Sequence, residues 1–159
     1  MNAIQAQAMR QLLERQDVAA LGTLHNGEPF VSMVPYALAP DGQGFVIHVS
    51  RLATHTKDME THPGVSLLVM DERTPEVPPQ ALPRVTVQGQ AQPCAPDAPL
   101  YAAAKEAYLS RFPNSQEMFG FADFSLFVIE PRSLRVVGGF AQAWSVTAAD
   151  FVRFMGEGG

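Results

Sequence analysis

Short apolar or alternating segments separated by turn residues dominate this chain and predict a mainly β protein. The segments span residues 18–24, 29–37, 45–50, 65–70, 84–92, 124–130 and 133–137, lengths typical of strands. The Asn26-Gly27 pair between the first two segments predicts a tight hairpin. Antiparallel strands joined by short connections tend to close into a barrel, which removes exposed edges. We therefore expect an antiparallel barrel of six to seven strands.

Helical spacing is confined to the ends of the chain and to two insertions. Residues 3–15 place Ile4, Ala8, Met9, Leu12 and Leu13 on one face, which predicts an amphipathic helix. A second helix is expected over 98–111, followed by a loop at 112–121. Thr147 and Asp150 resemble a capping box that begins a last helix. We expect one domain over residues 1–159, with an N-terminal helix at 1–16, the barrel at 17–144 and a C-terminal helix at 147–155.

The segment from Phe45 to Met70 predicts a strand, a short helix and a returning strand. Thr54 is the expected N-cap, Asp58 and Glu60 fall in the early turns, and Pro63-Gly64 ends the helix. A helix N-terminus with free N–H groups, hydroxyls and cations suits an anion such as a phosphate. The candidate residues are Thr54, His55, Thr56 and Lys57. Threonine caps and single lysines are also common on ordinary surface helices, so the segment alone leaves both interpretations open.

Composition and charge restrict the function classes. The 159 residues carry a net charge of −5, which argues against a general nucleic-acid-binding protein. The single Cys94 excludes an intrachain disulfide and a multi-cysteine metal site. No apolar run reaches the roughly 18–20 residues that span a bilayer, and the N-terminus lacks a secretion signal. We expect a cytoplasmic protein that binds neither nucleic acid nor membrane.

Four stretches together resemble the FMN-binding split barrel of the pyridoxamine 5′-phosphate oxidase superfamily. They are VAALGTLHNGEPFVSMVPYA, VIHVSRLATHTKDMETHPGVSLLV, PRVTVQGQA and VGGFAQAW. The segments LATHTKDM and HPGVSLLV are most similar to the haem-utilisation (HugZ-like) branch. The resemblance implies a split β-barrel with flanking helices, and a homodimer with FMN at the subunit interface. F420 and haem are the alternative cofactors.

The resemblance also implies positions that bind the cofactor. Those on the second strand, along the flavin edge, are Val31, Ser32, Met33 and Val34. The third strand would continue this wall with His48, Val49 and Ser50, and the phosphate would lie on Thr54, His55, Thr56 and Lys57. Arg84 falls where the oxidases have a glutamine that contacts the flavin, and Trp144 would cover the ring.

Three departures from the family pattern shape the functional prediction. Thr54 and His55 replace an Arg–Lys pair of the oxidases, and no arginine-containing substrate motif follows Trp144. The last histidine is His62, so a C-terminal haem-ligating histidine has no counterpart. We expect an FMN-dependent oxidoreductase acting on a small-molecule substrate and connected with haem utilisation. The alternative is a flavin- or haem-binding carrier or sensor without turnover.

The remaining candidates are assigned no chemistry. No catalytic residue and no metal site are predicted, because no His or Cys pair has ligand-like spacing. His25 is expected to be exposed in a hairpin turn, and His48 to be a core or interface residue with one hydrogen bond. His55 is open between a phosphate contact and a surface residue, and His62 is expected at a helix C-terminus.

Overall fold

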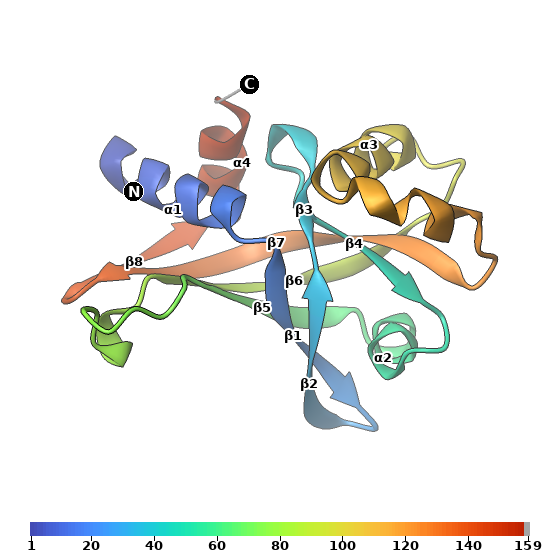
Figure 1. The fold of residues 1–159 in the computed structure, drawn as a ribbon, viewed down its shortest axis with the longest axis horizontal. Helices are drawn as coiled ribbons and strands as arrows, with labels where there is room; N and C mark the ends of the chain where they lie inside the picture. The colour runs from blue at the N-terminus through green and yellow to red at the C-terminus, as the bar shows by residue number, and fades with distance from the viewer. Residues whose placement is uncertain (158–159) are drawn as a thin grey trace.

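The computed structural model describes residues 1–157 as one antiparallel sheet that curls into a split barrel, with helices around it (Figure 1). The helices are α1 (Ala3–Arg15), α2 (Thr54–Thr61), α3 (Tyr101–Arg111) and α4 (Ala148–Gly156). Short 3-10 helices are η1 (Pro40–Gly42), η2 (Pro79–Ala81) and η3 (Pro113–Gly120). The strands are β1 (Val18–His25), β2 (Glu28–Pro35), β3 (Ala37–Leu38), β4 (Phe45–Ser50), β5 (Gly64–Met70), β6 (Arg84–Cys94), β7 (Phe124–Gly139) and β8 (Gln142–Thr147).

The strand order confirms the predicted fold class. It runs β2-β1-β5-β6-β7-β4-β3, and β8 pairs with β7. The hairpin between β1 and β2 turns at Asn26 and Gly27, both with positive φ (51° and 80°), as a tight hairpin turn requires. The sheet has eight strands rather than six to seven, because the chain adds the two-residue β3 and the hairpin strand β8.

The two strands expected on either side of Pro131 are one continuous strand, so this prediction was wrong. In the β6–β7 pair, Gly89 lies opposite Pro131 and Gln88 lies opposite Ser133. Arg132 is therefore an extra residue without a partner on β6, which is a β-bulge. The bulge accommodates the proline, and β7 continues to Gly139.

The main core fills the barrel and is covered by α1. Met9, Leu12 and Leu13 of α1 are buried in this cluster. The predicted helix has the right bounds, but Ile4 is 80% exposed and Ala8 is also exposed, while Ala6 is buried. Only the second half of the expected apolar face therefore packs on the barrel.

A second, smaller core lies between α3 and the outer face of the sheet. Ala104 and Tyr108 of α3 pack with Val46, Leu126 and Val128. The helix begins at Tyr101 rather than Ala98, and the expected loop at 112–121 contains η3. As predicted, Thr147 caps α4 by accepting a hydrogen bond from the Asp150 N–H. Within residues 1–157, no helix is both long and apolar enough to cross a bilayer.

Candidate binding site at the start of α2

Helix α2 follows the end of β4 and lies to the side of the β1–β2 hairpin, at the lower right of Figure 1. Its N-cap is Ala53, not Thr54, and no side chain caps it. Thr54 is already the first helical residue and its side chain is exposed. The predicted cap was therefore wrong by one residue, but the turn still presents unpaired first-turn N–H groups beside exposed Thr54 and Lys57.

Thr56 holds this turn in place rather than facing a ligand. Its side chain is fully buried and its hydroxyl donates to the Ser50 carbonyl at 2.6 Å. Ser50 in turn donates its own hydroxyl to Asp123 Oδ2 at 3.1 Å, and accepts from the Leu52 N–H. The end of β4 and the start of α2 are thus joined by short polar contacts that fix the backbone of the turn.

His55 joins the turn to β2. Its Nδ1 lies 3.2 Å from the Ser32 hydroxyl, and the ring is half-buried. Burial lowers the pKa of His55, and the nearby Asp58 carboxylate partly offsets this effect. The structure therefore brings together two groups of predicted site residues, the β2 strand and the α2 turn, through Ser32 and His55.

Asp58 anchors α2 to β1, a role that the sequence did not reveal. Its buried carboxylate accepts from the Thr23 hydroxyl at 2.9 Å and pairs with His25 Nδ1 at 2.7 Å. Burial raises the pKa of Asp58, but the hydrogen bonds from His25 and Thr23 and the charges of the two neighbouring histidines lower it further, to below its ordinary value. The first turn of α2 holds no acid, so the expected interaction of Asp58 with the helix dipole is absent. His25 is half-exposed, as expected for the end of a hairpin, yet it is paired.

The first four residues of β2 are exposed, and burial alternates only toward the end of the strand. Val34 is buried, whereas Val31 is 69% and Met33 is 62% exposed. Val49 on β4 is also buried in the main core. Val34 and Val49 could therefore contribute only backbone to a cofactor site, while Val31 and Met33 offer apolar side chains.

His48 lies in the smaller core instead of the barrel. Its ring stacks on Phe119 at a centroid distance of 3.8 Å and an angle of 4°. Nδ1 is buried without a hydrogen-bond partner, so the expected single hydrogen bond is missing at this atom. Burial, and to a lesser extent the Lys105 charge, lowers the pKa of His48 to about 4. Of the two environments predicted for His48, the core and the interface, these contacts support the core.

Arg84 and Trp144 lie away from the α2 turn within one chain. The Arg84 guanidinium donates to the carbonyls of Gln80 and Leu82, which fixes the loop before β6. Trp144 on β8 packs over Gly138, and its Nε1 is buried without a partner. His62 is the C-cap residue of α2, as predicted.

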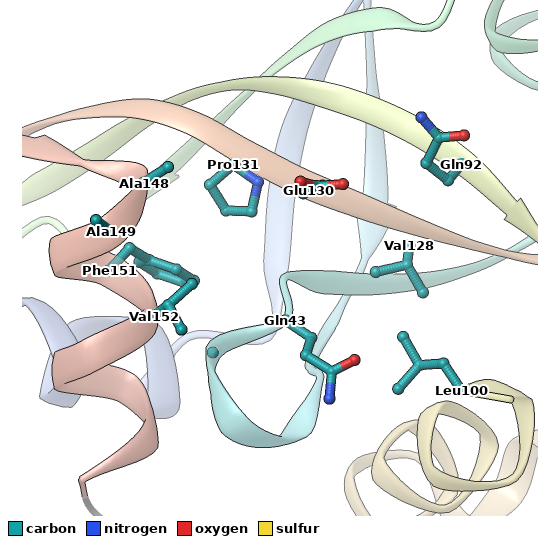
Figure 2. A pocket seen from close by; sticks show the side chains of 11 residues that line it. Gln43, Gln92, Leu100, Val128, Glu130, Pro131, Ala148, Ala149, Phe151 and Val152 are labelled. Carbon is teal, nitrogen blue, oxygen red and sulfur yellow. The ribbon is translucent and has the colours of Figure 1, made fainter.

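Another cavity, of about 440 Å³, lies between α4, η1 and β7 (Figure 2). Phe151 and Val152 point into it from α4, and Val128 and Pro131 approach from β7. It contains none of the predicted site residues. In the described part of the chain, no group of three or more His, Cys, Asp or Glu side chains is arranged to hold a metal ion.

Comparison with known proteins identifies the family. The profile of the pyridoxamine 5′-phosphate oxidase family matches residues 6–138. The chain belongs to this family. Its curated relatives place it in the haem-utilisation branch.

Two curated relatives carry heme oxygenase names. The chloroplastic non-canonical heme oxygenase HOZ of Arabidopsis thaliana is 38% identical over 120 residues, which cover 76% of this chain and 35% of that protein. Heme oxygenase HutZ of Vibrio cholerae is 28% identical over 130 residues, covering 81% of this chain and 73% of that protein. The chain thus spans about a third of the first relative.

A solved structure agrees with the fold. The heme-binding protein from Mycobacterium smegmatis superposes with a TM-score of 0.84 at 28% identity, covering 96% of this chain and 62% of that chain. The haem-utilisation branch expected from the sequence is therefore confirmed.

Proposed function

We propose that this protein binds haem and supports its oxidative breakdown, working as a homodimer. The relatives named heme oxygenases and the similar heme-binding structure support this proposal. The observation that carries it is the outer face of edge strand β2, where Val31 is 69% and Met33 is 62% exposed. Exposed apolar side chains on one strand mark a surface for a ligand or a partner.

The residues present suit a haem. A metal-binding imidazole in proteins commonly has its other ring nitrogen fixed by a hydrogen bond. Half-buried His55 is of this kind, since its Nδ1 lies 3.2 Å from the Ser32 hydroxyl. Both ring nitrogens of His25 are already in contact, with Asp58 and Asn26. When bound, the haem would supply the redox chemistry at its iron. The chain would supply the apolar face of β2 and the exclusion of water by a second copy. No side chain is assigned as an acid or a base.

The test combines spectroscopy with the oligomeric state. Haemin added to the purified protein should give a saturable Soret band, and sedimentation should give a dimer. With a reductant and oxygen, the band should disappear as an open-chain tetrapyrrole forms. Val31→Glu should weaken both haemin binding and dimerisation, because it places a charge on the apolar face. Ile4→Glu, at an apolar residue on α1 that is even more exposed, is the control. A monomer that gives no haemin spectrum would refute the proposal.

A second candidate is an FMN-dependent oxidoreductase, favoured by the α2 turn. Exposed Thr54 and Lys57 and the anchored His55 lie beside free N–H groups, and a phosphate needs such donors and cations. Lys57→Ala should weaken FMN more than riboflavin, because only FMN carries the phosphate. Lys105→Ala, the only other lysine, is the control. Equal losses for FMN and riboflavin would remove Lys57 from a phosphate site.

A further inference from the structure

The cavity of about 440 Å³ lies on the outer face of the sheet, between the start of α3 and helix α4 (Figure 2). Its floor is a row of side chains on β6 and β7. Gln92 pairs with Val128 across these strands, and Glu130, two residues further along β7, lies on the same face of the sheet. Leu100 borders the cavity on the α3 side and Val152 on the α4 side. The volume is within the range of small-molecule sites, about 300–1,000 Å³.

The wall formed by η1 and α4 is closely packed. Gly42 of η1 has a φ of 68°, and a Cβ on this glycine would lie 2.7 Å from Val152 Cα and 2.9 Å from the Val152 carbonyl oxygen. Phe151, the preceding residue of α4, is 1% exposed and belongs to the main core. Backbone contact on one side and a core residue on the other hold this wall in place, so the cavity exists before a ligand arrives.

The cavity combines apolar walls with a single charge. Leu100 and Phe151 are among the side chains that supply the apolar surface. Glu130 is the only charged residue in the lining formed by residues 1–157, and none of the ion pairs in this part of the chain includes its carboxylate. Gln43 and Gln92 also line the cavity, and their carboxamide oxygens are additional acceptors. A cation with an apolar body would meet a free carboxylate here and no competing positive side chain.

The first residues of α4 border the cavity as well, and the positive end of a helix dipole would oppose a cation. Thr147 caps this end by accepting a hydrogen bond from the Asp150 N–H, and Asp150 places a carboxylate in the first turn. Arg153, which pairs with Asp150 at 3.7 Å, is not part of the cavity lining. The helix end therefore carries a carboxylate of its own, and Glu130 determines which charge the cavity accepts.

We propose that this cavity binds an organic amine, with one ammonium group on an apolar aliphatic or aromatic body. The ammonium pairs with Glu130 and donates to the carboxamide oxygens of Gln43 and Gln92. The apolar body lies between Leu100 and Val152. The site lies apart from the α2 turn and from the exposed face of β2, and it does not depend on the proposed haem function.

The test titrates three probes of similar shape into the protein by calorimetry. They are tryptamine, which is a cation at pH 7, the neutral alcohol tryptophol and the anion indole-3-propionate. Tryptamine should bind about tenfold more tightly than tryptophol, because only tryptamine makes a charge-assisted hydrogen bond to the carboxylate. Indole-3-propionate should bind most weakly, because its charge has the same sign as that of Glu130.

Two variants test the role of charge directly. Glu130→Gln should lower the affinity for tryptamine to that for tryptophol and leave the affinity for tryptophol unchanged. Val152→Lys adds an ammonium to the α4 wall and should weaken tryptamine while strengthening indole-3-propionate. Both residues are exposed, so both variants should keep the wild-type melting temperature. Glu76→Gln, at an exposed glutamate in the loop after β5, should bind all three probes as the wild type does.

The outcomes separate this inference from the haem proposal. Equal affinities of the wild type for the three probes, or a preference for tryptamine that persists in Glu130→Gln, would refute the amine site. A wild type that binds none of the probes would also refute it, and altered sedimentation of Val152→Lys in that case would indicate that a protein surface covers the cavity. Haemin titrated in parallel should give the same curve for the wild type and Glu130→Gln, so the loss of amine binding leaves the haem proposal standing.

Discussion

The Ser32 hydroxyl lies 3.2 Å from His55 Nδ1 and links edge strand β2 to the first turn of α2. The two residues are 23 positions apart in the chain, and their contact is the one direct side-chain hydrogen bond found between these two elements in residues 1–157. It fixes the orientation of a half-buried imidazole whose pKa is lowered by burial. Whatever binds at the turn meets a histidine that is already oriented.

Ser32→Ala tests this link. Losing a single neutral hydrogen bond should cost about 1 kcal/mol of unfolding free energy. FMN affinity should fall about fivefold, since the imidazole would no longer be held in one orientation. Urea unfolding and an FMN titration measure the two effects. Ser110→Ala, at an exposed serine on α3, is the matched control. A Ser32 variant that behaves like this control would show that the link is incidental.

Asp58→Asn should change both stability and its dependence on pH. Because the folded pKa of Asp58 lies below its ordinary value, the carboxylate contributes stability that is complete above about pH 4 and is lost as the pH falls through the folded pKa. His25 and His55 face this carboxylate, and their charges are among the causes that lower its pKa. The variant should lose about 1–3 kcal/mol at pH 7 and show a shallower decline in acid.

The measurement for Asp58 is urea unfolding between pH 3 and pH 7. Asp97→Asn, at an exposed aspartate in the loop before α3, should follow the wild-type curve. Parallel pH curves for the wild type and the Asp58 variant would mean that another group causes the acid sensitivity.

His48→Phe should stabilise the protein, most strongly in mild acid. Phenylalanine can keep the stack on Phe119 and removes the buried Nδ1 that lacks a partner, a gain of about 1 kcal/mol. The pKa of His48 is about 4 in the folded state, against about 6.5 when unfolded. The unfolded chain therefore binds a proton that the folded chain excludes, and stability falls as the pH drops from about 6.5 to 4.

Thermal unfolding between pH 4 and pH 7 checks this expectation. The wild-type melting temperature should drop across this range, and that of the His48 variant should drop less. Lys105, the charge that faces His48 from α3, should contribute to the same slope. An identical slope in both proteins would exclude His48 as its source.

The strands, the hairpin turn and the bounds of α1 could be predicted because each depends on local pattern. Val18–His25 alternates, Asn26-Gly27 supports two positive φ angles, and Pro63-Gly64 ends a helix at the expected place. The continuity of β7 could not be predicted, because a proline usually interrupts strand pairing. Only the bulge opposite Gln88 and Gly89 accommodates it.

The candidate site residues were selected by their positions in the sequence, and their contacts were not predicted. Resemblance selected Ser32 and His55 separately, and the fold brings them together. Asp58 was missed because its partners Thr23 and His25 lie more than 30 positions away, beyond any local pattern. Arg84 was assigned to the flavin, whereas within the chain it donates to loop carbonyls. Such long-range hydrogen bonds leave no periodic signal in a sequence.

Arg111 gives the sharpest test of how the helices are held on the barrel. From the last turn of α3, its guanidinium donates to the carbonyls of Leu13, Glu14, Gln16 and Tyr36. Three of these carbonyls end α1, where the helix leaves its acceptors unpaired and a positive charge is favourable. Arg111→Met should therefore lower the free energy of unfolding by about 3 kcal/mol, and Arg111→Lys by about half of this, because one ammonium cannot reproduce the planar set of donors. Urea unfolding measures both, with Arg73→Met, at an exposed arginine in the loop after β5, as the control. An Arg111→Met variant no less stable than the Arg73 variant would mean that packing alone holds α1 against α3.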